Sequence, residues 1–252
     1  MTADEYLQKI LAREAVDTGV YSPVRGVQTQ LQPAIREWAG NFLLGVSPSG
    51  SFAKGTANKS GTDIDLFISL AQNTPDTLKE IYETLCKKMT EKGYSPKRQN
   101  VSINVRVNGY SVDLVPAKRQ DSYTDDHSLY RRKADTWTKT NVTKHINHVR
   151  QSGRISEARI IKLWRNQKGL DFPSFYLELT AINALSGRYG TLSDNVMKVF
   201  EYLRDTFPNA RVVDPANTNN IISDDLTAAE RAKVKTAADQ ARNVSNWNQI
   251  VT

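Results

Sequence analysis

The sequence contains almost none of the residues that build disulfides or thiolate metal sites. Its 252 residues include one cysteine, Cys86, and three histidines, so no internal disulfide can form and a Cys/His zinc site is not expected. No stretch approaches the roughly 20 apolar residues of a membrane span, and the N-terminal residues lack the basic start and apolar run of a secretory signal. We therefore expect a cytoplasmic protein with no membrane partner.

The charge balance of the chain indicates the kind of partner that it binds. Lysine and arginine outnumber aspartate and glutamate by 34 to 27, so the net charge is +7. A basic surface attracts polyanions, and we expect a partner that carries phosphates, such as a nucleotide or a nucleic acid. The basic residues are spread along the chain, however, and such a pattern is also typical of an ordinary solvated surface.

Periodicity predicts a mixed first half and a helical second half. Alternating residues predict a strand over residues 63–70, and Asn108-Gly109 predicts a hairpin within residues 101–117. Apolar residues at helical spacing, with capping residues at several ends, predict helices over residues 5–16, 27–43, 74–93, 154–170, 174–187, 192–207 and 225–244. This order of elements predicts an α+β protein.

The shift in composition predicts two lobes. We expect one lobe over residues 20–135 and a helical lobe over residues 136–252, which the N-terminal helix over residues 1–16 joins. The stretch over residues 118–140 is long and polar, so we expect it to connect the lobes.

The predicted strand over residues 63–70 carries two carboxylates, although acidic residues are rare in strands. Because alternate side chains of a strand share a face, Asp63 and Asp65 point the same way, with their Cβ atoms roughly 6 to 7 Å apart. Asp113, on the second strand of the predicted hairpin, becomes a third member of the group if the two strands are neighbours. The simpler interpretation is a pair of solvated acids at a strand end.

Three clustered carboxylates repel one another unless a cation offsets their charge. Oxygen ligands on rigid strands suit two Mg²⁺ ions, or Mn²⁺ in their place, which can clamp the attacking and leaving oxygens of a phosphoryl or nucleotidyl transfer. Upstream, Gly50 lets the backbone approach a ligand closely, and the N–H groups after it can bind a phosphate together with the Ser51 hydroxyl. These residues predict transfer chemistry on a phosphate-bearing substrate, with Asp63, Asp65 and Asp113 as catalytic and metal-binding residues.

Gly50-Ser51, Asp63-Ile64-Asp65 and the later strand residue Asp113 together resemble the DNA polymerase β-like nucleotidyltransferase superfamily. The resemblance implies a catalytic core of a mixed sheet with helices, a mostly helical C-terminal lobe, and an active site in the cleft between them. It does not separate the activities of the superfamily, which include CCA addition to tRNA, polyadenylation, antibiotic modification and second-messenger synthesis.

The helical half narrows the resemblance. Residues 159–185 look like the nucleotide-handling helices of oligoadenylate synthases and of the bacterial cGAS/DncV-like nucleotidyltransferases (CD-NTases). At the matching positions the resemblance implies that Lys162 and Ser174 contact the triphosphate and that Phe175 stacks on the base, with Tyr176 as an alternative. Without the resemblance, Lys162 is a lysine at the edge of an apolar helix stripe, and the two aromatic residues fill the core.

Residues 212–241 also resemble a late segment of these enzymes. The residues themselves predict only structure there: a turn at Asp214-Pro215, and a cap on the last helix from Asp224 or Asp225.

The resemblance covers residues 45–245 and implies a metal-dependent nucleotidyltransferase. Such an enzyme joins NTPs into a cyclic di- or oligonucleotide second messenger, releases pyrophosphate and acts in antiphage signalling, and a regulatory protein is a further partner to consider. One alternative is nucleotide addition to an oligonucleotide or RNA acceptor, as in CCA-adding enzymes and oligoadenylate synthases. The other is a nucleotide-binding protein without activity.

Overall fold

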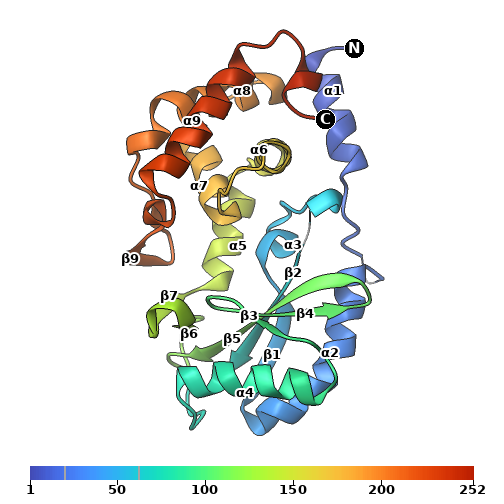
Figure 1. Ribbon diagram of the computed structural model, residues 1–252, viewed down its shortest axis with the longest axis vertical. Helices are drawn as coiled ribbons and strands as arrows, with labels where there is room; N and C mark the ends of the chain where they lie inside the picture. Colours follow the sequence, from blue (N-terminus) through green and yellow to red (C-terminus); the bar gives the residue numbers. More distant parts are fainter. Residues whose placement is uncertain (20, 62) are drawn as a thin grey trace. The chain divides into compact units, whose positions relative to one another are not determined.

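The computed structural model describes residues 1–19, 21–61 and 63–252 (Figure 1). Its internal contacts divide the chain into two compact units. Unit 1 comprises residues 1–16, 55–61 and 147–252, and unit 2 comprises residues 17–54 and 62–146. Residue 20, where the first lobe was expected to begin, lies outside the described residues. The short segment over residues 55–61 thus belongs to unit 1, although the chain on both sides of it belongs to unit 2.

Unit 2 is a mixed sheet with helices. Its strands run in the order β1-β2-β5-β4-β3, with β6 beside β5 and β7 beside β6, and the described pairs are antiparallel except β2 with β5. The strands are β1 (Leu43–Pro48), β2 (Ile64–Leu70), β3 (Lys97–Arg98), β4 (Ile103–Val107), β5 (Tyr110–Arg119), β6 (His127–Arg131) and β7 (Thr136–Thr140). The helices are α2 (Pro23–Ala39), α3 (Gly50–Lys54) and α4 (Leu78–Glu91).

One face of this sheet is apolar and packs on helices. Ile64, Leu66 and Ile68 of β2 are at most 1% exposed, and Val112 and Leu114 of β5 are fully buried. Helix α2 contacts β2, α4 contacts β5 and the two helices contact each other; in Figure 1, α4 is seen below the sheet and α2 to its right. The predicted alternation of the strand after Asp63 is therefore confirmed, and the even-numbered residues form its core face.

The second predicted helix, over residues 27–43, was misplaced. Helix α2 begins earlier, because the Ser22 hydroxyl accepts the N–H of Arg25 and Pro23 fits the first turn. It ends at Gly40, whose φ is +53°. Phe42, which seemed to prolong the helix, lies in a 3₁₀ turn over Gly40–Phe42, and Leu43 begins β1, which pairs antiparallel with β2.

The polar stretch over residues 118–140 was expected to connect two lobes, and this was wrong. β5 continues into it, β6 pairs with the end of β5, and β7 pairs with β6 along its length, so the stretch forms part of the sheet. Leu129 and Tyr130 of β6 are buried, whereas Trp137 of β7 is 57% exposed. A hairpin with so few buried apolar residues has a weak sequence signal.

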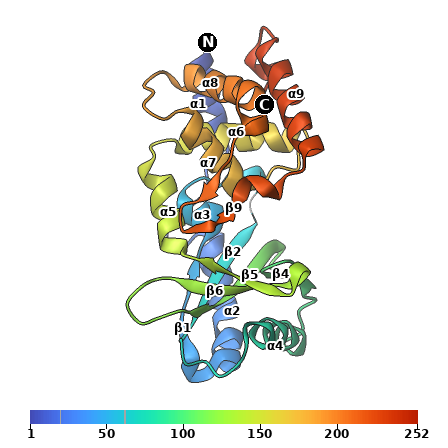
Figure 2. The ribbon, with the colours of Figure 1, turned by 90° about the vertical axis from the view of Figure 1, so that its left-hand side faces the viewer.

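Unit 1 is helical. Its core gathers buried residues from all the long helices, and large aromatic side chains fill its centre, among them Trp164, Phe172, Phe200 and Phe207. Its elements are α1 (Ala3–Arg13), α6 (Ile155–Gln167), α7 (Ser174–Ala184), α8 (Leu192–Asp205), β8 (Val213–Asp214), β9 (Asn217–Ile221) and α9 (Ala228–Arg242), and α5 (Val142–Gln151) begins in unit 2 and ends here. Helices α8 and α9 lie side by side (Figure 2).

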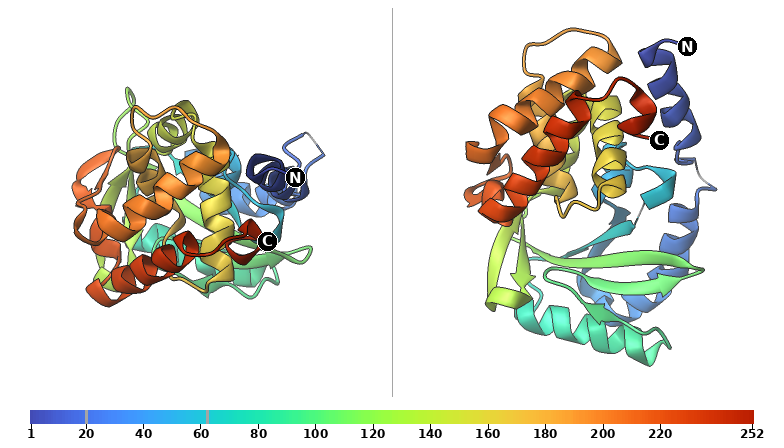
Figure 3. Two further views of the ribbon diagram at one scale, coloured as in Figure 1. Left: turned by 90° about the horizontal axis from the view of Figure 1, so that it is seen from above. Right: turned by 45° about the horizontal axis from the view of Figure 1, so that its top comes forward.

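The two ends of the chain meet within unit 1. The Tyr6 hydroxyl of α1 donates to the carbonyl of Val251 at 3.0 Å, and Figure 3 (right) shows the blue helix α1 beside the red C-terminal residues. None of the described helices is long and apolar enough to cross a membrane.

The cap predicted for the last helix was wrong. Thr227, rather than Asp224 or Asp225, caps α9, and Glu230 completes a capping box with it. The predicted turn at Asp214 is confirmed, because its carboxylate accepts the N–H of Ala216 at 2.8 Å.

Candidate active site

Two of the predicted acids lie opposite each other on neighbouring strands. β2 and β5 run parallel, and their register pairs Asp65 with Asp113. Partners in a parallel ladder project from the same face, so both side chains lie on the face opposite the helix-covered core. Asp63 lies one residue before β2 and is exposed. The condition set by the sequence, that the two strands are neighbours, is met.

Gly50 approaches Asp65 so closely that the position admits no side chain. A Cβ atom added to Gly50 would lie 1.7 Å from Oδ2 of Asp65, and the φ of Gly50 is +54°. Beside it, the Ser49 N–H donates to the Asp65 carbonyl at 2.8 Å and ties the turn to β2. Ser51 follows in the short helix α3 and is half-buried. The close backbone approach predicted at Gly50 is thus present, and here its neighbour is the Asp65 carboxylate.

Asp113 has an unusual electrostatic environment. Burial raises the pKa of its carboxyl and the charge of Asp63 raises it further, whereas hydrogen bonds from Asn104 and Ser102 lower it. Asn104, on β4, donates its amide to Oδ1 of Asp113 at 2.7 Å and to the Ser111 hydroxyl at 2.9 Å. A carboxyl with a raised pKa is a better proton acceptor than an ordinary aspartate. Asn104 was not predicted from the sequence, because only the register of β4 with β5 places it beside Asp113.

The acids fit a hard divalent cation by their chemistry. Mg²⁺ prefers carboxylate oxygens, and a cation would offset both the burial of Asp113 and its repulsion by Asp63. Among the described residues, however, no three Asp, Glu, His or Cys side chains are arranged to hold a metal ion. The backbone places Asp65 and Asp113 on one face of the sheet, and the charge of Asp63 acts on Asp113. Metal binding by all three therefore stays a prediction.

Lys162 is buried in unit 1 rather than lying at the edge of a helix stripe. Its side chain is 7% exposed and lies 3.4 Å from the carboxylate of Glu178, which is fully buried. Its Nζ also donates to the carbonyl of Thr56 at 3.1 Å. The interpretation of Lys162 as a snorkelling surface lysine is thus wrong. Glu178 and Thr56 were missed, although a lysine and a glutamate on adjacent apolar helices are a signal for a buried pair.

Ser174 begins α7 and is held by an arginine. Nη1 of Arg165 donates to the Ser174 hydroxyl oxygen at 3.0 Å and to the Phe172 carbonyl at 2.6 Å. Burial lowers the pKa of Arg165, and the nearby charges of Glu178 and Asp171 raise it. Because the arginine donates to Ser174, the hydroxyl hydrogen is free to point elsewhere. Arg165 was not singled out from the sequence.

The structure separates Phe175 from Tyr176. Tyr176 is 0% exposed and packs among core rings, 5.1 Å from Phe172 and 5.4 Å from Phe207 between ring centroids. Phe175 is half-buried at the edge of that core. Of the two aromatic residues, Phe175 is therefore the one that is partly exposed, and stacking on a base stays a prediction.

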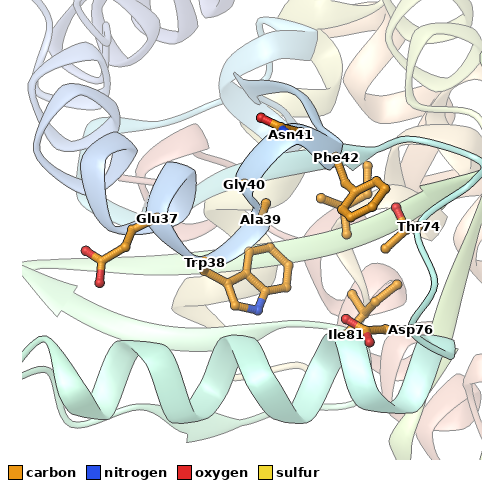
Figure 4. A pocket seen from close by; sticks show the side chains of 10 residues that line it. Glu37, Trp38, Ala39, Gly40, Asn41, Phe42, Thr74, Asp76 and Ile81 are labelled. Atoms are coloured by element: carbon orange, nitrogen blue, oxygen red, sulfur yellow. The ribbon is translucent and has the colours of Figure 1, made fainter.

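A pocket of about 340 Å³ in unit 2 lies away from these residues (Figure 4). Trp38, Phe42 and Ile81 line it together with Leu70, the last residue of β2, whereas Asp65 is near the start of that strand. None of the predicted site residues, all of which are described, lines this pocket. It therefore adds nothing to the candidate site.

Two curated proteins are similar to this chain. The chain is 22% identical over 208 residues to the cyclic AMP-AMP-AMP synthase of Escherichia coli (strain MS 115-1), covering 74% of this chain and 65% of the relative. It is 26% identical over 238 residues to the CCA-adding enzyme of Thermococcus gammatolerans, covering 86% of this chain and 47% of that enzyme. The chain thus spans less than two thirds of the length of either relative.

Solved structures confirm the fold. E. coli MS115-1 CdnC with ATP has a TM-score of 0.76 at 20% identity, covering 96% of this chain and 91% of that one. The same protein in a CdnC:HORMA-deltaN complex has a TM-score of 0.73 at 19% identity, covering 95% of this chain and 89% of that one. The predicted polymerase β-like nucleotidyltransferase fold of the CD-NTase type is confirmed.

A family match supports the same conclusion from the sequence. Residues 2–152, more than half of the chain, match the Second Messenger Oligonucleotide or Dinucleotide Synthetase domain, SMODS. The match contains Gly50, Ser51 and all three predicted acids. The chain therefore belongs to the SMODS family.

Proposed function

We propose that this protein is a nucleotidyltransferase that joins NTPs into a cyclic di- or oligonucleotide and releases pyrophosphate. The observation that carries the proposal is the parallel register that pairs Asp65 with Asp113, with Gly50 held against Asp65. Membership of the SMODS family and the similarity to a cyclic AMP-AMP-AMP synthase support the same reaction. Antiphage signalling and a cytoplasmic location belong to the proposal as well.

The proposal gives each predicted residue one task. The backbone after Gly50 and the Ser51 hydroxyl donate hydrogen bonds to the triphosphate. Lys162 offers a point charge to the phosphates. Ser174 donates its hydroxyl hydrogen to them, while its oxygen accepts a hydrogen bond from Arg165. Phe175 stacks on the base. Such stacking is possible with any base, because every base has a π-face.

The three acids, Asp63, Asp65 and Asp113, would hold the divalent metal. When bound, Mg²⁺ supplies charge stabilisation for the phosphates and lowers the pKa of the attacking hydroxyl. Asp113 has a raised pKa because it is buried, so it is suited to accept the hydroxyl proton. The freed oxygen attacks the α-phosphorus in line, the bond to the β-phosphate oxygen breaks, and pyrophosphate leaves.

A second candidate function is nucleotide addition to an RNA end. The similarity to a CCA-adding enzyme over 86% of this chain favours it. The same residues would perform the same transfer, but the acceptor would be a polynucleotide. The net charge of +7 suits such an acceptor.

A regulatory protein partner is also part of the proposal. The similar protein CdnC has been described in a complex with HORMA. We therefore propose testing activity with and without proteins from the same source that co-purify with this chain.

The test is an incubation of the purified protein with Mg²⁺ or Mn²⁺ and four radiolabelled NTPs. The products are treated with phosphatase and separated, and an Asp63→Asn/Asp65→Asn variant is run beside the wild type. A phosphatase-resistant product that the variant does not make supports the proposal, and its mass identifies the bases. Products that lengthen added tRNA instead would support the second candidate. NTP binding without any product, under every metal and acceptor, would leave the inactive binding protein.

A further inference from the structure

A buried polar network in unit 1 joins Lys162 to Glu178 and Thr56. The side chains of Lys162 and Glu178 are 7% and 0% exposed, and Thr56 is 0% exposed. Burying an ammonium, a carboxylate and a hydroxyl in a small helical core lowers the stability of the fold unless every group has a hydrogen-bond partner. The roles proposed so far assign a task to Lys162 alone, and they do not explain why its partners are a carboxylate and a hydroxyl.

The direction of each hydrogen bond follows from chemistry. An ammonium can only donate, an ionised carboxylate can only accept, and a hydroxyl can do both. The Thr56 hydroxyl therefore donates to Oε1 of Glu178 and offers its lone pairs to Lys162. Nζ of Lys162 has acceptors in the Thr56 carbonyl at 3.1 Å, Oε1 of Glu178 at 3.4 Å and the Thr56 hydroxyl at 3.5 Å. One carboxylate oxygen thus holds both the lysine and the threonine.

Thr56 lies in a segment with a special position in the chain. Residues 55–61 pack in unit 1, yet in the sequence they join α3, which begins at Gly50, to Asp63 and β2. The segment has a second attachment to α6, because Asn58 donates to the Arg159 carbonyl at 2.9 Å and accepts from Nε of Arg159 at 3.0 Å. The carboxylate of Glu178 is therefore linked through Thr56 to the peptide that leads into the first predicted metal acid.

We propose that Glu178 is a positioning residue for nucleotidyl transfer, which fixes the Lys162 ammonium and, through Thr56, the segment that leads to Asp63. The inference rests on the proposed function, since it needs Lys162 to contact the triphosphate. Glu178 also carries the same sign of charge as the triphosphate, so the two compete for the ammonium. Holding the geometry and weakening the binding are thus two effects of one carboxylate.

The two effects predict a split between affinity and rate. Glu178→Gln keeps the size of the side chain and removes its charge. We expect the Kd of a non-reactive NTP analogue to fall by about 3-fold, because the competing charge is gone, and kcat to fall by about 10-fold, because Thr56 loses its charged acceptor. A variant that merely damaged the fold would bind the analogue more weakly and react more slowly.

Thr56→Val isolates the positioning effect. It removes the hydroxyl but keeps the side-chain volume, the Lys162–Glu178 ion pair and the Thr56 carbonyl, so we expect kcat to fall about 5-fold with an unchanged Kd. Thr180→Val is the matched control. Thr180 is equally buried in α7, but its hydroxyl donates to the Tyr176 carbonyl at 2.8 Å. The kcat and the Kd of the Thr180→Val variant should therefore match those of the wild type.

Measurements of Kd by titration of the analogue and of kcat by pyrophosphate release decide the question. The inference is overturned if Glu178→Gln binds the analogue more weakly than the wild type, or if Thr56→Val has a wild-type kcat. If Glu178→Gln does not fold, the kcat of Thr56→Val decides alone. Lys162→Met separates this inference from the proposed function. If Lys162→Met binds the analogue like the wild type, the assigned role of Lys162 is wrong. If it binds weakly while the Glu178 and Thr56 variants behave like the wild type, only the inference is wrong.

Discussion

In unit 2 the register of two β-strands places the predicted acids, whereas in unit 1 side-chain hydrogen bonds place the predicted nucleotide contacts. Asp65 and Asp113 are partners in a parallel ladder, so their positions depend on the whole sheet. Lys162 depends on Glu178, and Ser174 depends on Arg165. Substitution of a predicted acid in unit 2 is therefore expected to change the chemistry while leaving the geometry intact, and substitution of Glu178 or Arg165 in unit 1 is expected to change the geometry of its neighbour.

The largest effect is expected when an acid is neutralised. Asp65→Asn and Asp113→Asn should each lower kcat by about 1,000-fold or more, because the amide cannot hold a metal ion. Both variants should fold, because the ladder is built by the backbone. The measurement is pyrophosphate release, with circular dichroism as the check on folding.

Asp113→Asn should lower kcat but raise the stability of the fold. Burial raises the pKa of Asp113 in the folded protein, so its ionisation costs stability as the pH rises through that raised pKa. Asp113→Asn should therefore melt at a higher temperature than the wild type at pH 8, and this difference should disappear at pH 3, where the carboxyl is protonated. A lower melting temperature at pH 8 would contradict the assigned environment.

A side chain at Gly50 is expected to have the next largest effect. Gly50→Ala places a Cβ 1.7 Å from Asp65 Oδ2 at a φ of +54°, so kcat should fall by about 100-fold and the free energy of unfolding by about 2 to 4 kcal/mol. Gly40→Ala is the matched control, because Gly40 has a φ of +53° and no atom within 4 Å of an added Cβ. It should lose about 1 kcal/mol and keep its kcat. Equal effects of the two variants would mean that backbone strain, not the approach to Asp65, matters.

Smaller effects are expected at the start of α7. Phe175→Ala should raise the KM for NTP by about 10-fold, which is a typical loss for one base stacked on an aromatic ring. Tyr176→Phe should leave KM unchanged and stabilise the protein by about 1 kcal/mol, because the Tyr176 hydroxyl is buried without a hydrogen-bond partner among the described residues. A raised KM in Tyr176→Phe would reverse the choice between the two residues.

The smallest effect is expected on the pH profile. If Asp113 accepts the proton, kcat should fall at low pH, where its carboxyl becomes protonated. The hydrogen bond from Asn104 lowers that pKa, so Asn104→Ala should move the acid limb of the profile to higher pH. Ser111→Ala removes the other acceptor of Asn104 but keeps its bond to Asp113, and its acid limb should match the wild type.

Sequence predicted the parts of the fold that depend on local periodicity. The strand after Asp63, the hairpin at Asn108-Gly109 and the long helices of unit 1 were found, because their apolar residues repeat at the spacing of the element. The β6–β7 hairpin was missed, because it adds to the edge of an existing sheet and buries little. Its strands pair with their neighbours in the sequence, but too few of their residues are apolar to give an alternating pattern.

Some residues of the candidate site could likewise be predicted from the sequence, and others could not. Residues with a chemical role of their own, such as Asp65 and Lys162, were singled out from motifs. Their partners were not, because Asn104 and Glu178 act only through a neighbour that the tertiary structure supplies.

The single cysteine described at the outset has a practical consequence. Cys86 is 2% exposed, and burial raises the pKa of its thiol, so the native chain should react slowly with maleimides. New cysteines could then be labelled without first removing the native one. Tyr123→Cys in unit 2 and Tyr189→Cys in unit 1 replace side chains that are each 95% exposed. A fluorophore pair at these positions would report, by energy transfer in solution, whether the distance between the two units changes when NTP binds.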